Sequence, residues 1–170
     1  MKGKEHKERY KEKLGYCQNK RSEKDVIWVN ALGLGETLSL TLFLKELSKV
    51  FSDHIILLTS STLQSKLALD NISLPKNIIH QFAPVDNYYA LGSFLDYWKP
   101  KMALFSELDI WPLRTSKLKE RKIPLLLINT RMDEKKKASR KRLGKLFSAP
   151  LKQFDHIFLQ DQSSKSHLME

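Results

Sequence analysis

The sequence predicts an α/β fold, a Rossmann-like doubly wound parallel sheet of about six strands. Short apolar runs alternate along the chain with segments whose apolar residues recur at helical spacing. The apolar runs show little polar alternation, which is typical of strands buried on both faces and hence of a parallel sheet. A chain of 170 residues, 41% of them hydrophobic, can bury the core of one such domain.

The N-terminal residues differ in character from the rest of the chain. Residues 1–24 are highly charged with almost no apolar face, so we expect a basic helical segment followed by a polar linker. Residues 25–170 are expected to form the α/β domain. Its first strand is predicted at 26–31, where VIWVNA is apolar and β-branched, and its first helix at 36–50, where ETLSLTLFLKELSKV has helical periodicity.

The later elements follow as strand–helix pairs. Strands are expected where the sequence reads HIILLT (54–59), NIIHQFA (77–83), KMALF (101–105), IPLLLIN (123–129) and HIFLQ (156–160). Helices are expected near 62–70, 88–98, 112–121 and 133–149. The last residues, SSKSHLME, resemble the start of a further helix, and we expect another element of the fold to follow them.

The net charge of +11 is concentrated in two segments. Residues 1–24 contain nine Lys and Arg against four Glu, and residues 135–145 contain seven Lys and Arg and no acid. Such patches attract phosphates, anionic lipid headgroups or nucleic acid, although solvated basic faces are at least as common. We expect no nucleic-acid partner, because the patches lack aromatic interleaving and the sequence has no recognised nucleic-acid module.

Composition also argues against two other classes of protein. No apolar run approaches the roughly 20 residues that cross a bilayer, and the N-terminus is polar, so we expect neither a spanning helix nor a secretory signal. Cys17 is the single cysteine, which excludes an internal disulfide and a cysteine-based zinc cluster. This cysteine usage suits a reducing cytoplasm.

The turn after the first predicted strand, ALGLGE (31–36), carries the strongest candidate residue. It places Glu36 at the start of a helix, beyond the carboxyl end of a strand, where open α/β sheets bind ligands. The turn lacks the GxGxxG spacing of a dinucleotide site and the GK[ST] of a phosphate loop. Taken alone, it favours the plainer interpretation of Glu36 as a first-turn acid, which stabilises a helix by about 0.3–1 kcal/mol.

Several distinctive strings occur in one order along the chain. They are GKEHKERYKEKLG, IWVNALGLGE, LLTSSTLQS, IHQFAPVD, FLDYWKP, SELDIWP, IPLLLINTRM and LQD. From about Gly3 to Asp161, this ordered set resembles the N-terminal domain of bacterial 3-deoxy-D-manno-octulosonic acid (Kdo) transferases, glycosyltransferase family 30. The resemblance implies the N-terminal half of a GT-B enzyme of lipopolysaccharide core biosynthesis. Such enzymes move Kdo from CMP-Kdo to a hydroxyl of the lipid A precursor, lipid IVA.

The resemblance also implies roles for acidic residues. The family's catalytic glutamate falls on Glu36, which would act as general base toward the acceptor hydroxyl. The family's second acidic motif falls on SELDIWP, with Glu107 and Asp109 in its acidic positions. Those two residues would bind sugar hydroxyls or orient the acceptor, or else serve as a capping acid and a loop charge.

Four further positions are interpreted in the same way. Gly35, beside Glu36, is expected to bind the acceptor. The hydroxyls of the loop TSST (59–62), which begins with Thr59 and Ser60, either face the ligand cleft or cap the second helix. Arg131 either reaches an acceptor phosphate through its planar guanidinium or forms a surface salt bridge.

The resemblance implies no metal and no cofactor, since CMP-Kdo is the donor substrate. The expected partners are the lipid A precursor, the anionic inner-membrane surface and a separate donor-binding domain or chain. The chain would lie peripherally at the cytoplasmic face of the bacterial inner membrane. There, residues 135–145 would contact anionic lipid at roughly 1 kcal/mol per basic residue.

The sequence departs from the family pattern at several places. Gly33 stands where the family has a serine, Asn30 where it has a histidine, Asp109 where it has a glutamate and Leu113 where it has an asparagine. The family's membrane-anchoring helix and its CMP-Kdo-binding second domain have no counterpart in these 170 residues. The alternative hypothesis is therefore a non-catalytic truncated remnant, or an anionic-lipid-binding module, with the same fold.

Overall fold

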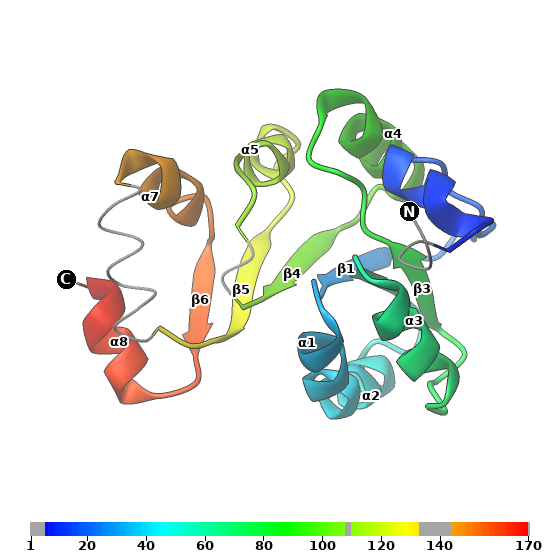
Figure 1. The fold of residues 1–170 in the computed structure, drawn as a ribbon, viewed down its shortest axis with the longest axis horizontal. Coiled ribbons are helices and arrows are strands. Elements are labelled where there is room, and N and C mark those ends of the chain that lie inside the picture. Colours follow the sequence, from blue (N-terminus) through cyan, green and yellow to red (C-terminus); the bar gives the residue numbers. More distant parts are fainter. Residues whose placement is uncertain (1–5, 108–109, 133–143, 170) are drawn as a thin grey trace.

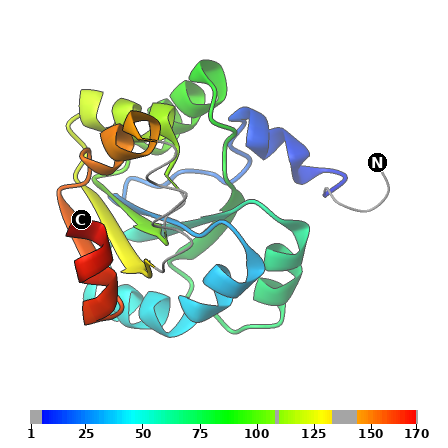
Figure 2. The same cartoon turned by 60° about the vertical axis from the view of Figure 1, so that its left-hand side comes forward.

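The computed structural model describes residues 6–107, 110–132 and 144–169. Six parallel strands form one sheet with helices on both faces (Figure 1, Figure 2). The strands are β1 (Val26–Asn30), β2 (Ile55–Ser60), β3 (Ile78–Phe82), β4 (Met102–Ser106), β5 (Leu125–Thr130) and β6 (His156–Leu159). The predicted α/β fold with a doubly wound parallel sheet of six strands is confirmed.

The strand order is β3-β2-β1-β4-β5-β6, so β2 and β3 lie on one side of β1, and β4, β5 and β6 lie on the other. At the carboxyl end of β1, Asn30 pairs with Thr59 of β2 and with Phe105 of β4. Asn30 therefore ends the central strand where the order reverses. Ligands of open α/β sheets bind in the crevice beyond the strands at this kind of switch point.

The helices fall into two layers. They are α1 (Leu34–Ser39), α2 (Thr41–Val50), α3 (Leu63–Asp70), α4 (Tyr88–Trp98), α5 (Pro112–Glu120), α7 (Lys145–Leu151) and α8 (Gln162–Met169). Figure 1 shows α4, α5 and α7 on one face of the sheet and α1, α2, α3 and α8 on the other. Within the described ranges, no helix has the length and apolar character needed to cross a bilayer.

Most helix predictions are confirmed. α3, α4 and α5 match the expected helices, and α8 is the further helix expected at the end of the chain. Of the helix expected at 133–149, residues 133–143 lie outside the described part, and the remainder falls on α7.

The helix predicted at 36–50 differs from its prediction. It begins at Leu34 and is divided at Leu40 into α1 and α2. Near the division, the carbonyl of Glu36 accepts hydrogen bonds from the hydroxyl of Ser39 (2.8 Å) and from Leu40 N (3.1 Å). Side-chain hydroxyls that bond to carbonyls of the preceding turn compete with the helical ladder and bend helices.

Two apolar cores flank the sheet, because alternate residues of each strand point to opposite faces. On the face of α4, Trp28 packs against Phe94 and Phe105, with ring centroids 4.8 Å and 5.2 Å apart. On the face of α1 and α2, Ile27 and Val29 belong to a separate aliphatic cluster.

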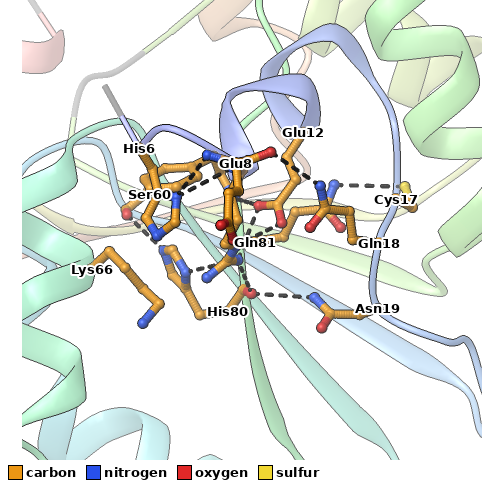
Figure 3. Close-up of polar contacts among 12 residues, drawn as sticks. His6, Glu8, Glu12, Cys17, Gln18, Asn19, Ser60, Lys66, His80 and Gln81 are labelled. Carbon is orange, nitrogen blue, oxygen red and sulfur yellow. Dashed lines mark hydrogen bonds and ion pairs between the residues drawn. The ribbon is translucent and has the colours of Figure 1, made fainter. Parts of the chain in front are cut away.

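The N-terminal segment packs against the edge strand β3 (Figure 3). Its helix, η1 (Arg9–Leu14), is a six-residue 3-10 helix, shorter than the charged helix expected there. Glu12 is 1% exposed; its carboxylate accepts hydrogen bonds from Phe82 N at 2.8 Å and from Arg9 Nε at 2.7 Å. Arg9 Nη2 also donates to His80 O at 2.8 Å. The segment therefore covers backbone groups that an open sheet edge would leave unpaired.

Candidate functional site

Glu36 lies directly beyond β1, at the carboxyl edge of the sheet. Gly33 is the N-cap residue of α1, and Glu36 lies in the first turn of that helix. Its Oε2 accepts a hydrogen bond from the backbone N–H of Leu32 at 2.7 Å, and the side chain is half-buried. This contact gives an acceptor to the N–H of the residue that precedes the N-cap, and so ties the turn to the first turn of α1. It also holds a carboxylate at the edge where the resemblance to Kdo transferases implies a base.

The backbone conformation does not require the two glycines of this turn. Gly33 has an extended backbone (φ −112°, ψ 179°), and Gly35 is not among the positive-φ glycines. Apart from the adjacent residues and the backbone of α1 itself, a Cβ added at either position would meet no atom of the described chain within 4 Å. The surface above the turn is therefore open, which suits close approach of a ligand, and the acceptor contact of Gly35 stays a prediction.

A buried hydrogen-bond chain supports the end of β1. Trp28 Nε1 donates to Thr59 Oγ1 at 2.8 Å, and Thr59 Oγ1 donates to Asn30 Oδ1 at 2.9 Å. Arg114, only 3% exposed, donates to the same Asn30 oxygen at 3.4 Å and to Pro84 O at 2.9 Å. Thr59 is fully buried, so its hydroxyl joins β1 to β2 and does not face a ligand cleft, which was one of its two expected roles.

Ser60 is fully buried as well, and its hydroxyl contacts Nε2 of His80 at 2.8 Å (Figure 3). The expected capping of the second helix by a hydroxyl of this loop is confirmed at Thr62, whose Oγ1 accepts from Ser65 N at 3.1 Å at the start of α3. Burial, followed by the charge of Arg9, lowers the pKa of His80 to about 3. The imidazole is therefore neutral near pH 7 and serves this buried network.

Glu107 follows β4 on the same edge of the sheet as Glu36. Its side chain is half-buried, and its backbone N–H donates to Ile128 O at 3.1 Å. Its φ of 61° lies in the left-handed region, which costs a non-glycine residue about 1–3 kcal/mol and is concentrated at functional sites. Asp109, the other acid of the motif, lies outside the described residues. Among the residues that are described, no group of three or more His, Cys, Asp and Glu could hold a metal ion.

Arg131 is exposed just beyond β5. It lies near Asp161, whose pKa is lowered chiefly by the backbone N–H of Ser164 and, to a smaller extent, by the charge of Arg131. An acidic neighbour agrees with the surface ion-pair interpretation of Arg131. Its contact with an acceptor phosphate stays a prediction.

An apolar groove of about 510 Å³ lies between the α1–α2 pair and strands β4, β5 and β6. Its apolar lining consists of Leu40, Phe43, Leu47, Leu104, Leu126, Ile128, Phe158 and Leu159. Its polar rim is joined by hydrogen bonds, from Gln160 Nε2 to Asn129 Oδ1 at 2.9 Å and from Asn129 Nδ2 to Ser39 Oγ at 3.5 Å. The groove therefore reaches the short helix that carries Glu36.

This groove was not predicted from the sequence. Two aromatic residues of its lining, Phe43 and Phe158, remain 36% and 55% exposed. The two residues lie on α2 and β6, which are far apart in the sequence. No local pattern in the sequence joins them, so only the folded sheet brings them to one groove.

The chain is similar to known proteins over nearly its whole length. Residues 8–170 match a family model described as 3-deoxy-D-manno-octulosonic-acid transferase (kdotransferase). The chain is 32% identical over 160 residues to the 3-deoxy-D-manno-octulosonic acid transferase of Rickettsia bellii, covering 94% of this chain and 38% of that protein. The protein of the same name from Haemophilus influenzae is 22% identical over 147 residues, covering 86% and 34%. The chain thus spans little more than a third of the length of these relatives.

Among solved structures, the UDP-N-acetylglucosamine 2-epimerase of Rickettsia bellii is similar with a TM-score of 0.53 and 17% sequence identity. The likeness covers 86% of this chain and 42% of the epimerase. At this identity it concerns the fold alone, and it agrees with the Rossmann-like sheet described above.

Proposed function

Because this chain belongs to the 3-deoxy-D-manno-octulosonic acid (Kdo) transferase family, we propose that it is the acceptor-side half of a glycosyltransferase that transfers Kdo. In this proposal the donor is CMP-Kdo, the acceptor is a hydroxyl of the lipid A precursor lipid IVA, and no metal or cofactor takes part. The observation that carries the proposal is the carboxylate of Glu36, fixed by the N–H of Leu32 at the switch point of the sheet.

Glu36 acts as the general base in the proposed reaction. The acceptor oxygen forms a bond to the anomeric carbon of Kdo as its proton passes to the Glu36 carboxylate. The bond from the anomeric carbon to the phosphate oxygen breaks, and CMP leaves with its electron pair. A positioned base of this kind contributes about 10²–10⁴-fold to a rate.

The apolar groove supports a lipid acceptor. Acyl chains gain roughly 25 cal/mol for each Å² of apolar surface removed from water. Arg131 lies two residues beyond Asn129 of the groove rim, so a phosphate on the acceptor sugar is the proposed partner of its guanidinium. Gly35, Glu107 and Asp109 are proposed to contact the sugar itself. Thr59 and Ser60 are buried, so they are assigned no contact with the acceptor.

The proposed location is the cytoplasmic face of the bacterial inner membrane, where the lipid acceptor is embedded. Residues 135–145 are proposed to lie against anionic lipid. The CMP-Kdo site is assigned to a donor-binding domain or chain, in keeping with the greater length of the relatives.

A chimaera tests the proposal. This chain replaces the matching 38% of the Rickettsia bellii relative, and release of CMP from CMP-Kdo is measured in the presence of lipid IVA. The proposal predicts CMP release that depends on lipid IVA. A folded chimaera that binds CMP-Kdo but produces no Kdo-modified lipid would contradict it.

The same experiment separates the alternative, a lipid-binding module without activity. The exposed apolar groove is the observation that favours this alternative. It predicts binding of lipid IVA by the chain and by the chimaera, with no turnover in either.

A further inference from the structure

A second hollow, of about 600 Å³, lies at the amino ends of β2 and β3, on the opposite edge of the sheet from Glu36. Three separate segments line it: the loop before β1, the end of α2 and the residues that lead into β3. Each segment contributes lysine, and together they supply Lys20, Lys24, Lys49 and Lys76.

A hydrogen-bonded frame fixes the inner part of this hollow. Ser48, 6% exposed, donates from its hydroxyl to Asn77 Oδ1 at 2.5 Å. The amide of Asn77 in turn donates to the carbonyls of Phe51 and His54, at 3.2 Å each. The end of α2 and the start of β3 are therefore held in one arrangement, so a ligand need not order them.

The charge in this hollow is only partly balanced. Lys49 Nζ pairs with Glu46 at 2.7 Å. The pKa of Asp53 is lowered first by its hydrogen bond to His54, and the charge of Lys24 contributes to the same shift. Within the described part of the chain, Lys20 and Lys76 form no ion pair.

We propose that this lysine hollow binds the phosphate groups of a multivalent anion. Lysine ammonium groups act as point charges toward phosphate oxygens, and the hydroxyls of Ser22 and Ser52 add neutral donors at the same hollow. Like charges held together repel one another, and a phosphate anion relieves that repulsion. The site accounts for part of the basic excess of residues 1–24, and it is independent of the Kdo-transfer proposal.

The test uses the whole chain, with inorganic pyrophosphate as the probe at low ionic strength. Titration calorimetry measures affinity, and thermal unfolding measures the rise in Tm that a ligand of the native state produces. We expect the wild type to bind and to gain Tm. The double variant Lys20→Ser, Lys76→Ser is expected to lose at least about tenfold in affinity, because two phosphate contacts are removed.

Two controls make this test specific. Lys152→Ser removes an exposed lysine outside the hollow and is expected to bind as the wild type does. Without pyrophosphate, the double variant is expected to unfold no earlier than the wild type, since it relieves repulsion. The proposal would be overturned if the wild type did not bind pyrophosphate, or if the double variant bound it as tightly as the wild type. It would also be overturned if Lys152→Ser lost as much affinity for pyrophosphate as the double variant.

Vesicles distinguish a free phosphate compound from a lipid headgroup. Sedimentation with phosphatidylglycerol vesicles is compared with sedimentation with phosphatidylcholine vesicles. If the double variant loses sedimentation with phosphatidylglycerol vesicles and pyrophosphate competes, the hollow takes a headgroup phosphate. If sedimentation is unchanged while pyrophosphate affinity falls, the hollow takes a soluble phosphate compound.

Discussion

Glu36 combines a structural contact and a proposed chemical role in one carboxylate. Its Oε2 accepts the N–H of Leu32 and so closes the turn that leads into α1. Glutamine retains a side-chain oxygen for that contact but cannot take up the acceptor's proton. Replacement by glutamine therefore separates the two roles, whereas replacement by alanine removes both.

His80 gives the protein a defined sensitivity to acid. Its folded-state pKa of about 3 lies below the ordinary value of 6.5. Between these two pH values, His80 is therefore protonated in the unfolded chain and neutral in the folded chain. Stability therefore falls as the pH falls from about 6.5 toward 3. We expect His80→Gln to lose less Tm than the wild type between pH 7 and pH 4.5.

Thermal unfolding followed by circular dichroism across this pH range measures the effect. His156→Gln, at an exposed histidine of β6, is the matched control and is expected to keep the wild-type slope. Parallel slopes for His80→Gln and the wild type would show that burial of this imidazole does not govern the acid response.

The sequence was a better guide to Glu36 than to its polar neighbours on β2. A glycine turn after an apolar strand places Glu36 at the edge whatever the packing around it. The hydroxyls of Thr59 and Ser60 depend on which partners the folded core offers. Those partners are Trp28 and His80, which lie on other strands. The sequence of β2 and its neighbours does not predict these contacts.

At the scale of elements, η1 is a strap across the edge of the sheet. Glu12 accepts the outward N–H of Phe82, and Val85 N donates to Lys13 O at 2.9 Å. Gly15, with φ 90°, ends the strap, and a Cβ there would lie 2.4 Å from Ala90 O. The strap is therefore tied to both β3 and α4.

Removing the buried carboxylate should destabilise the whole domain. Glu12→Ala leaves Phe82 N without its acceptor and Arg9 without its ion-pair partner, and we expect a loss of about 2–4 kcal/mol in the free energy of unfolding. Urea unfolding measures this loss. Glu8→Ala, at an exposed glutamate of the same segment, is the control and should change stability by less than about 0.5 kcal/mol. If both variants lost a similar free energy of unfolding, η1 would stabilise the domain through its overall charge and not through the contact of Glu12 with Phe82.

The strands were predicted from sequence more accurately than the helix starts. Apolar runs buried on both faces leave few alternatives, and all six runs became strands of one sheet. The division of α1 from α2 was not visible, because Ser39 fits a helical pattern while its hydroxyl bonds to the carbonyl of Glu36. The charge pattern of residues 1–24 does not indicate that η1 is a 3-10 helix or that Glu12 bonds to Phe82 of β3.

At the scale of the whole molecule, the fold brings a carboxylate and an apolar groove to one region. Glu36 comes from the turn after β1, while the groove is completed by β5 and β6 about 90 to 120 residues later. Ser39 and Asn129 link the two parts at the rim. This arrangement suits an acceptor with a polar sugar and an apolar tail.

The groove can be tested apart from the base. Phe43→Ser together with Phe158→Ser removes two partly exposed aromatic side chains, so the fold should be retained while acyl-chain contact is lost. In the chimaera we expect the KM for lipid IVA to rise about tenfold or more, with the KM for CMP-Kdo unchanged. Leu42→Ser, at an exposed leucine of α2 outside the groove, is the control. Equal changes in both KM values would indicate that the groove does not bind the lipid.

Glu36 is proposed to accept the proton of the acceptor hydroxyl. The decisive measurement is the rate of Kdo transfer to lipid IVA by the chimaera carrying Glu36→Gln, beside one carrying Glu46→Gln on the adjoining helix. We predict a fall of about 10²–10⁴-fold in kcat for Glu36→Gln, with KM values and Tm close to wild type, and no fall for Glu46→Gln. Transfer by Glu36→Gln at the wild-type rate would contradict this prediction.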